Sequence, residues 1–88
     1  MDNEMLGLVA HVKISSYRLK TVMSLYDSDK TPSQIAKDTG IRINHISTVL
    51  KKLKELGIVV CLNEDDKRNR IYQLTPVGRR VVDCFDLI

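Results

Sequence analysis

A segment near the middle of the chain carries hydrogen-bonding and cationic side chains on one side of a predicted helix. In residues 41–57, IRINHISTVLKKLKELG, a rotation of about 100° per residue places Asn44 and Thr48 opposite the apolar Ile46 and Leu50. An asparagine amide can bond adenine bidentately, a serine or threonine hydroxyl can bond several base edges, and lysine suits phosphate. These residue types in this pattern could therefore recognise the base edges and the backbone of duplex DNA.

The predicted contacts divide between bases and phosphates. Helices that read the major groove typically present their N-terminal residues to the base edges. We therefore assign base contacts to Asn44, Ser47 and Thr48, and backbone or groove-edge contacts to Arg42, Lys51, Lys52 and Lys54. The alternative interpretation is an ordinary solvated helix face, and for this helix taken alone it is the favoured one.

A second cluster of charged side chains follows in residues 64–70, EDDKRNR. Three carboxylates precede three cations there, so the cluster has no net charge, but Lys67, Arg68 and Arg70 gather on its returning side. Strand-like sequence flanks the cluster as IVVCLN and IYQL, which predicts an antiparallel hairpin with the charges at its tip. We expect Arg68 and Arg70 to lie near the minor groove or the backbone; the alternative is a solubilising loop.

A short helix is predicted immediately before the polar helix. Thr31 is suited to the N-cap, Pro32 to the first helical position and Gln34 to a capping box, and Gly40 ends the helix. Free N–H groups at such a helix start can attract a phosphate, and the Ser33 hydroxyl could add to them. We rank the structural role of this cap first and a phosphate contact of Ser33 second.

Apolar spacing predicts the buried faces of the remaining elements. In a helix over residues 15–26 the inward stripe is Leu19, Val22, Met23 and Tyr26. In the hairpin the inward residues are Ile58, Val60 and Leu62, met by Tyr72 and Leu74. A last helix opens at Thr75 and Pro76 and turns inward Val77, Val81 and Phe85. Residues 5–14 could extend the first helix, form a strand, or pack on a partner.

The order of these elements is helix, helix, helix, hairpin, helix. Two helices joined by about three residues that include Gly40 form a helix-turn-helix pattern, with the second helix at about residues 43–56. A hairpin with a basic tip directly after it is typical of a winged helix. We therefore predict an α+β, mainly helical fold over residues 1–88 as one domain, with a three-helix core, a two-stranded wing and a C-terminal helix.

The segments IAKDTGIRINHISTVLKKLKELGIV and DKRNRIYQLTPVG resemble the winged-helix regulators of the MarR and ArsR type, over about residues 15–82. The similarity is greatest to small single-domain archaeal members that begin with an SxYR helix, here Ser15 to Arg18. The resemblance implies sequence-specific DNA binding as a homodimer, with repression as the expected effect on transcription. It also implies that Asp66 steadies Arg68, whose guanidinium reaches the minor groove.

The composition narrows the classes of protein further. The formal net charge is +3, and no apolar run approaches the roughly 20 residues that a membrane-spanning helix needs. Two cysteines, Cys61 and Cys84, form neither a disulfide framework nor a zinc spacing, which favours a cytoplasmic protein with reduced thiols. We see no constellation of catalytic residues and expect no enzyme activity, no metal and no cofactor.

The ends of the chain are apolar. The head, MLGLVAHV, and the tail, VVDCFDLI, would otherwise fray in water. We expect residues 1–14 and 83–88 to pack across a two-fold axis in a homodimer; the alternative is that both fold back on the core of one chain. The rival function is a winged helix used as a protein–protein module of the transcription machinery, which predicts an apolar or acidic outer face on the third helix.

Overall fold

Side-chain caps start most helices of this protein, whose computed structural model describes residues 2–87. Helices α1 (Asn3–Lys13), α2 (Ser16–Asp27), α3 (Pro32–Thr39) and α5 (Pro76–Asp83) each follow a capping oxygen, respectively from Asp2, Ser15, Thr31 and Thr75. The predicted capping box is present: Thr31 Oγ1 accepts the Gln34 N–H at 3.2 Å, and Gln34 Oε1 accepts the Thr31 N–H at 2.9 Å. Helix α4 (Ile43–Glu55) has Arg42 at its N-cap, and the Arg42 side chain makes no capping hydrogen bond.

Two glycines end the helices of the helix-turn-helix. Gly40 follows α3 with φ of 76°, and Gly57 follows the C-cap of α4 with φ of 75°. A side chain is strained in this left-handed region, whereas glycine adopts it freely. The turn between α3 and α4 is therefore fixed by local sequence, as predicted.

A two-stranded antiparallel hairpin follows α4. Strand β1 (Val59–Cys61) pairs with β2 (Tyr72–Leu74), with Val59 opposite Leu74 and Cys61 opposite Tyr72. The predicted face of the first strand was wrong, because Val59 and Cys61 are buried whereas Val60 and Leu62 are exposed. Ile58 is buried as predicted, but it precedes β1 in the turn after α4, where its carbonyl accepts the Thr75 N–H at 3.0 Å.

One apolar core joins all the helices and the hairpin. Its fully buried members include Val9 of α1, Leu25 of α2, Ile35 of α3, Leu53 of α4 and Val81 of α5. Burial of each such side chain contributes on the order of 1.5–3 kcal/mol before conformational entropy is subtracted. The same core therefore holds α4 and the hairpin in fixed positions relative to each other.

The inward stripes of two helices differ from the prediction. On α2 the buried residues include Thr21, Val22 and Leu25, whereas Met23 and Tyr26 are 45% and 41% exposed. On α5, Gly78 and Val81 are buried and Val77 is exposed. Val22 and Val81 are buried as predicted, and Leu19 and Phe85 pack partly buried against the core. Each buried stripe is shifted toward small residues such as Thr21 and Gly78, which a hydropathy pattern does not mark.

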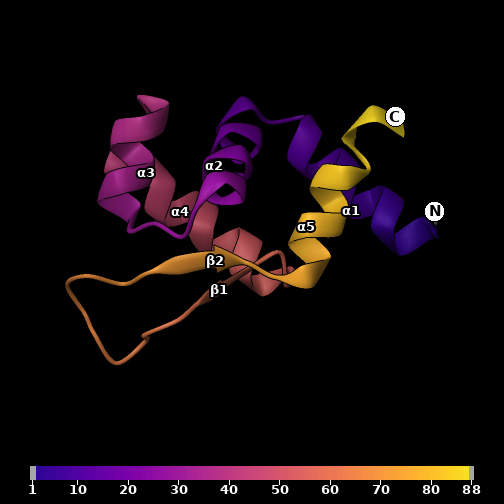
Figure 1. Cartoon of the computed structure of the whole chain (residues 1–88). Coiled ribbons are helices and arrows are strands. Elements are labelled where there is room, and N and C mark those ends of the chain that lie inside the picture. Colours follow the sequence, from indigo (N-terminus) through magenta and orange to yellow (C-terminus); the bar gives the residue numbers. More distant parts are fainter. Residues whose placement is uncertain (1, 88) are drawn as a thin grey trace.

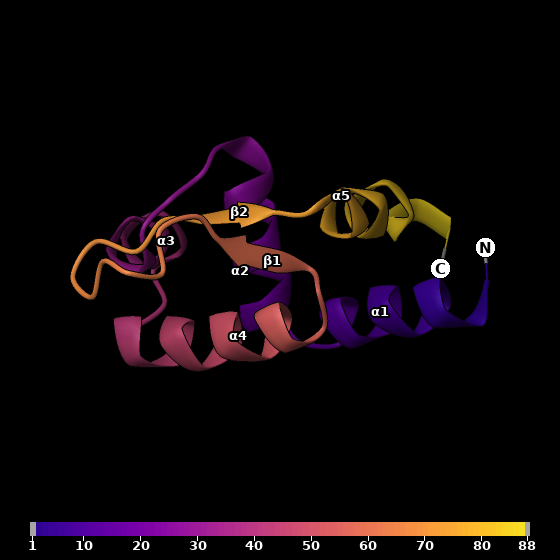
Figure 2. The same cartoon turned by 90° about the horizontal axis from the view of Figure 1, so that it is seen from below.

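The N-terminal segment, for which the sequence left three possibilities, forms a separate helix, α1, that packs against α2 and α5. Figures 1 and 2 show α1 and α5 together at the end of the molecule opposite the wing. Met5, Val9 and Val12 face the core of the same chain, and Lys13 Nζ donates to the Phe85 carbonyl of η1 (Phe85–Leu87) at 2.6 Å. Within residues 2–87 every helix is too short or too polar to cross a membrane.

Candidate nucleic-acid interface

One long side of α4 is free of other elements among residues 2–87, as Figure 2 shows. The apolar side, with Ile46, Leu50 and Leu53, is buried in the core. The opposite side exposes the residues predicted to bind DNA, which are Arg42, Asn44, Ser47, Thr48, Lys51, Lys52 and Lys54. A helix of this kind fits the width of the major groove of B-form DNA.

The N-terminal half of α4 presents short polar groups. The Thr48 hydroxyl donates to the Asn44 carbonyl one turn earlier, at 3.2 Å. This bond fixes the direction of the Thr48 hydroxyl proton and leaves its oxygen lone pairs outward as acceptors. The Asn44 side chain is exposed, and its amide has no hydrogen-bond partner within residues 2–87, so both its donor and its acceptor face solvent.

The wing is ordered by its own side chains. Asn63 closes its base, because Oδ1 accepts the Ile71 N–H at 2.7 Å and Nδ2 donates to the Asn69 carbonyl at 2.9 Å. Arg70 donates from Nε to the Asp66 carbonyl at 3.2 Å and from Nη2 to the Glu64 carbonyl at 3.3 Å. The Arg70 guanidinium therefore holds two carbonyl groups of the loop in addition to any external partner.

Asp66 shapes the tip of the wing. Its Oδ1 accepts the backbone N–H groups of Arg68 at 2.8 Å and of Asn69 at 3.0 Å. These bonds hold the pKa of the Asp66 carboxyl below its ordinary value, first through the Asn69 N–H and then through the Arg68 N–H. The carboxylate binds the backbone at Arg68 and leaves the guanidinium of that residue exposed.

A groove of about 490 Å³ lies between α4 and the wing. Its cations come from both sides and are Lys51, Lys54, Lys67, Arg68 and Arg70. Ser47, Leu50, Pro32 and Tyr72 complete the lining. Five cationic side chains around one groove produce a positive potential that attracts a polyanion. The two clusters recognised separately in the sequence are thus parts of one surface.

An ion pair joins one of the cations that line this groove to the wing. Lys54 of α4 donates to Glu64 of the wing, and both side chains are about half exposed. The hydrogen bond to Glu64 raises the pKa of Lys54, and the same bond lowers the pKa of Glu64. Both groups are therefore charged at neutral pH.

Other predicted site residues lie away from the groove. Lys52 is on the opposite flank of α4, paired with Glu55 at 3.9 Å. Ser33 is exposed at the start of α3, where Thr31 and Gln34 already satisfy the cap. Arg42 precedes α4 as its N-cap residue. The groove thus unites Ser47, Lys51, Lys54, Arg68 and Arg70, while Arg42, Asn44, Thr48, Lys52 and Ser33 surround it or lie beyond it.

Two features of this surface were missed in the sequence. Lys67 lines the groove, and its position beside Asp66 and Arg68 was the available signal. The ring of Tyr17 on α2 lies 5.3 Å from the ring of His45 on α4, tilted by 51°. This contact fixes the N-terminal part of α4 against α2, and no local sequence pattern announces it.

A buried polar atom lies on α1. Among residues 2–87 the buried Nε2 atom of His11 has no hydrogen-bond partner, while Arg18 Nη1 donates to the His11 carbonyl at 3.0 Å. Burial lowers the pKa of His11, and the positive charges of Arg18 and Lys52 lower it further. Both effects favour the neutral form of the His11 side chain. Residues 2–87 contain no group of three or more His, Cys, Asp or Glu side chains that could hold a metal.

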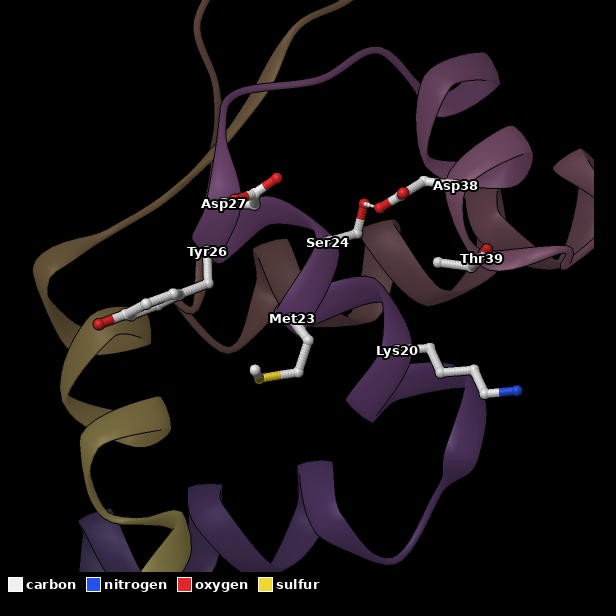
Figure 3. A pocket seen from close by; sticks show the side chains of 7 residues that line it. All are labelled: Lys20, Met23, Ser24, Tyr26, Asp27, Asp38 and Thr39. Carbon is white, nitrogen blue, oxygen red and sulfur yellow. Dashed lines mark hydrogen bonds between the residues drawn. The ribbon is translucent and has the colours of Figure 1, made fainter.

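A second depression of about 530 Å³ lies beside α2 and contains the side chains of Lys20, Met23 and Tyr26 (Figure 3). At its edge the Ser24 hydroxyl donates to Asp38 Oδ2 at 2.7 Å. In Figure 3 the side chains of Lys20, Met23 and Tyr26 lie on the near side of α2, whereas α4 passes behind it. This side of the molecule therefore faces away from α4 and supplies control positions for substitutions in the groove.

Comparison with known proteins identifies relatives of this arrangement. Residues 15–60, just over half of the chain, match the family model described as bacterial regulatory protein, arsR family. No curated protein matches the sequence at a significant level.

Three solved structures illustrate the similarity of fold. TubR bound to 24 bp of tubC from Bacillus thuringiensis serovar israelensis pBtoxis has a TM-score of 0.82 at 12% identity, covering 94% of this chain and 92% of its own. The second structure is the homodimeric winged helix-turn-helix DNA-binding domain of Mb0332 from Mycobacterium bovis, a possible ArsR-family regulator. It has a TM-score of 0.71 at 23% identity, and the match covers 94% of this chain and 73% of that domain. A MarR-family regulator from Enterococcus faecalis has 0.77 at 19%, covering 99% and 82%. The fold is a winged helix-turn-helix, as predicted.

Proposed function

The chain belongs to the arsR family of bacterial regulatory proteins and is a DNA-binding regulator, and from this premise we propose that α4 enters the major groove while the wing, residues 64–70, lies against the minor groove or the backbone. The observation that carries the proposal is the cationic groove between α4 and the wing. Phosphate contacts at this groove would fix the position of the duplex relative to α4.

Base contacts are assigned to the N-terminal half of α4. The Asn44 amide offers a donor and an acceptor that suit adenine, and Ser47 and Thr48 offer hydroxyl groups. All three side chains are exposed on the free side of the helix. Phosphate contacts are assigned to the cations that line the groove, with Arg42 and Lys52 further along the backbone. Ser33 is a secondary phosphate contact.

A homodimer would supply two such surfaces. Exposed apolar residues remain on α1, directly after it and in the C-terminal segment: Leu6 is 41% exposed, Ile14 79% and Leu87 67%. The core-facing side of α1 is used within the chain, so the two-fold contact is assigned to the outward side of α1 and to the C-terminal segment. The homodimeric state of the Mb0332 domain, which has the same fold, supports a homodimer. Two half-sites about one helical turn apart would follow.

We further propose a sign of regulation and a compartment. Repression is the effect on transcription that the family resemblance implies, and we assign repression and a cytoplasmic location to the chain. The family consists of DNA-binding regulators, which are generally not enzymes, and we assign no reaction to this member. An archaeal source stays a prediction. The rival protein–protein module predicted an apolar or acidic face on α4, whereas the exposed side carries polar and basic groups.

The test is a salt titration of binding to a random-sequence duplex, followed by fluorescence anisotropy. Lys51→Gln and Arg68→Ala each remove one proposed phosphate contact, so each should reduce the magnitude of the slope of log K against log salt by about 0.9. Lys20→Gln removes the same charge on the side of α2 away from α4 and should leave the slope unchanged. Equal slopes for all four proteins would refute the proposed groove.

A further inference from the structure

Glu64 places a carboxylate inside the surface that is proposed to bind DNA. Its partner Lys54 lies in the last turn of α4 and lines the cationic groove with Lys51 and Arg68. A negative charge at this position opposes phosphate binding through its own field, and it also occupies the ammonium group that would otherwise meet a phosphate. Glu64 therefore opposes DNA binding in two ways.

The position of Glu64 is set by the wing. The Arg70 guanidinium donates to the Glu64 carbonyl at 3.3 Å, and the preceding residue, Asn63, joins the two sides of the hairpin through Asn69 and Ile71. The wing thus presents the Glu64 carboxylate toward α4 from an ordered loop.

We propose that Glu64 is a positioning residue that withholds Lys54 from DNA until a backbone phosphate, correctly seated in the groove, replaces the carboxylate. The inference rests on the proposed function of the groove. An exposed ion pair contributes little to stability, so a phosphate can displace it. Loosely bound duplex does not displace it, and Lys54 then releases no counterion from that duplex. The Lys54–Glu64 pair therefore lowers the affinity for nonspecific DNA, while it permits Lys54 to contact a phosphate in a correctly seated complex.

The neighbouring acidic residue provides a matched control. Asp65 is exposed one position along the wing, and it forms no ion pair within residues 2–87. Glu64→Gln and Asp65→Asn therefore remove the same charge from nearly the same place, and only the first releases Lys54. Both residues are exposed, so both variants should fold, which thermal unfolding of each protein verifies.

The experiment measures the affinity of each variant for a random-sequence duplex over a series of salt concentrations. Glu64→Gln should bind about two- to fivefold more tightly than the unaltered protein, given the usual strength of an exposed ion pair. Its log–log salt slope should be steeper by about 0.9, because Lys54 then releases one more phosphate counterion. Asp65→Asn should leave the slope unchanged. In a Lys54→Gln background, Glu64→Gln should increase the affinity for the duplex no more than Asp65→Asn does.

The outcomes separate this inference from the proposed function. If the unaltered protein binds no duplex at low salt, the proposed function fails and the inference fails with it. If the unaltered protein binds with a normal salt dependence but Glu64→Gln and Asp65→Asn behave alike, only the inference is overturned. The inference is also overturned if the Glu64→Gln effect persists when Lys54 is Gln.

Discussion

The carboxylate of Asp66 accepts the backbone N–H of Arg68 at 2.8 Å. The family resemblance implied that this aspartate steadies the arginine, and in the structure it does so through the main chain. A second bond, from the Asn69 N–H at 3.0 Å, completes the turn at the tip of the wing. The direction in which the Arg68 side chain leaves the loop is therefore set by the carboxylate, while its guanidinium stays available for DNA.

This relationship predicts different effects for two substitutions of Asp66. Asp66→Ala and Asp66→Asn both remove the negative charge, but only Asn retains an oxygen that can accept the two N–H groups. Because Asp66→Ala loses these two hydrogen bonds, it should bind duplex DNA several-fold more weakly than Asp66→Asn. Anisotropy titrations of the two variants provide the comparison. Equal affinities would mean that the turn does not position Arg68.

His11 predicts a dependence of stability on pH. Its pKa in the folded protein lies below the ordinary value of 6.5, so the unfolded chain binds more protons between these two values. The free energy of unfolding should therefore be greatest above pH 6.5 and should fall as the pH decreases toward the folded pKa. Thermal unfolding at a series of pH values between 8 and about 5 measures this loss.

The chain holds one other histidine, which serves as a control for the first. His45 is exposed on α4. His11→Leu should flatten the decrease in the unfolding midpoint below pH 6.5, whereas His45→Gln should retain it. The same decrease in all three proteins would assign it to other groups.

Two glycines predict opposite changes in stability. A Cβ atom on Gly78 of α5 would overlap the carbonyl oxygen of Ile58 and would lie 3.2 Å from Leu74 Cδ2. Gly78→Ala should therefore destabilise the fold by about 1–3 kcal/mol or more, because the backbone must shift. Gly7 of α1 has open space around it, so Gly7→Ala should stabilise the helix by about 0.5–1 kcal/mol. Denaturant unfolding measures both; a stable Gly78→Ala would contradict the packing of α5 on the hairpin.

The outward side of α1 predicts concentration-dependent association. Sedimentation at micromolar concentration should detect a dimer of the 10.0 kDa chain. Leu6→Glu places a charge in the proposed contact and should weaken association at least about tenfold, since burying an unpaired charge is strongly unfavourable. Met23→Glu, on the exposed side of α2, should leave it unchanged. A single 10.0 kDa species at every concentration would exclude the homodimer.

Features determined by neighbouring residues could be predicted from the sequence. The caps at Thr31 and Thr75 and the helix ends at Gly40 and Gly57 depend on a few adjacent residues, and all four lie where they were expected. The strand face was predicted wrongly because Ile58 is apolar and directly adjoins β1 although it belongs to the turn. Hydropathy does not distinguish these two kinds of buried residue.

The shape of the candidate site could be predicted only in part. The polar face of α4 follows from helical periodicity, which placed Asn44 and Thr48 on its exposed side. The groove depends on where the hairpin lies relative to α4, and Glu64 is ten positions after Lys54 in the sequence. Such a pairing is a tertiary contact that no local pattern encodes. The contact of Tyr17 with His45 has the same origin.

The central claim is that α4 reads base edges, and binding by Asn44→Ala and Thr48→Ala variants tests it most directly. Duplexes selected from a random pool by the unaltered protein provide a preferred sequence, and a scrambled duplex provides the reference. Each variant should lose about 1–3 kcal/mol of preference for the selected sequence while it retains its affinity for the scrambled one. If both variants keep the full affinity and the full preference of the unaltered protein, α4 does not read the bases.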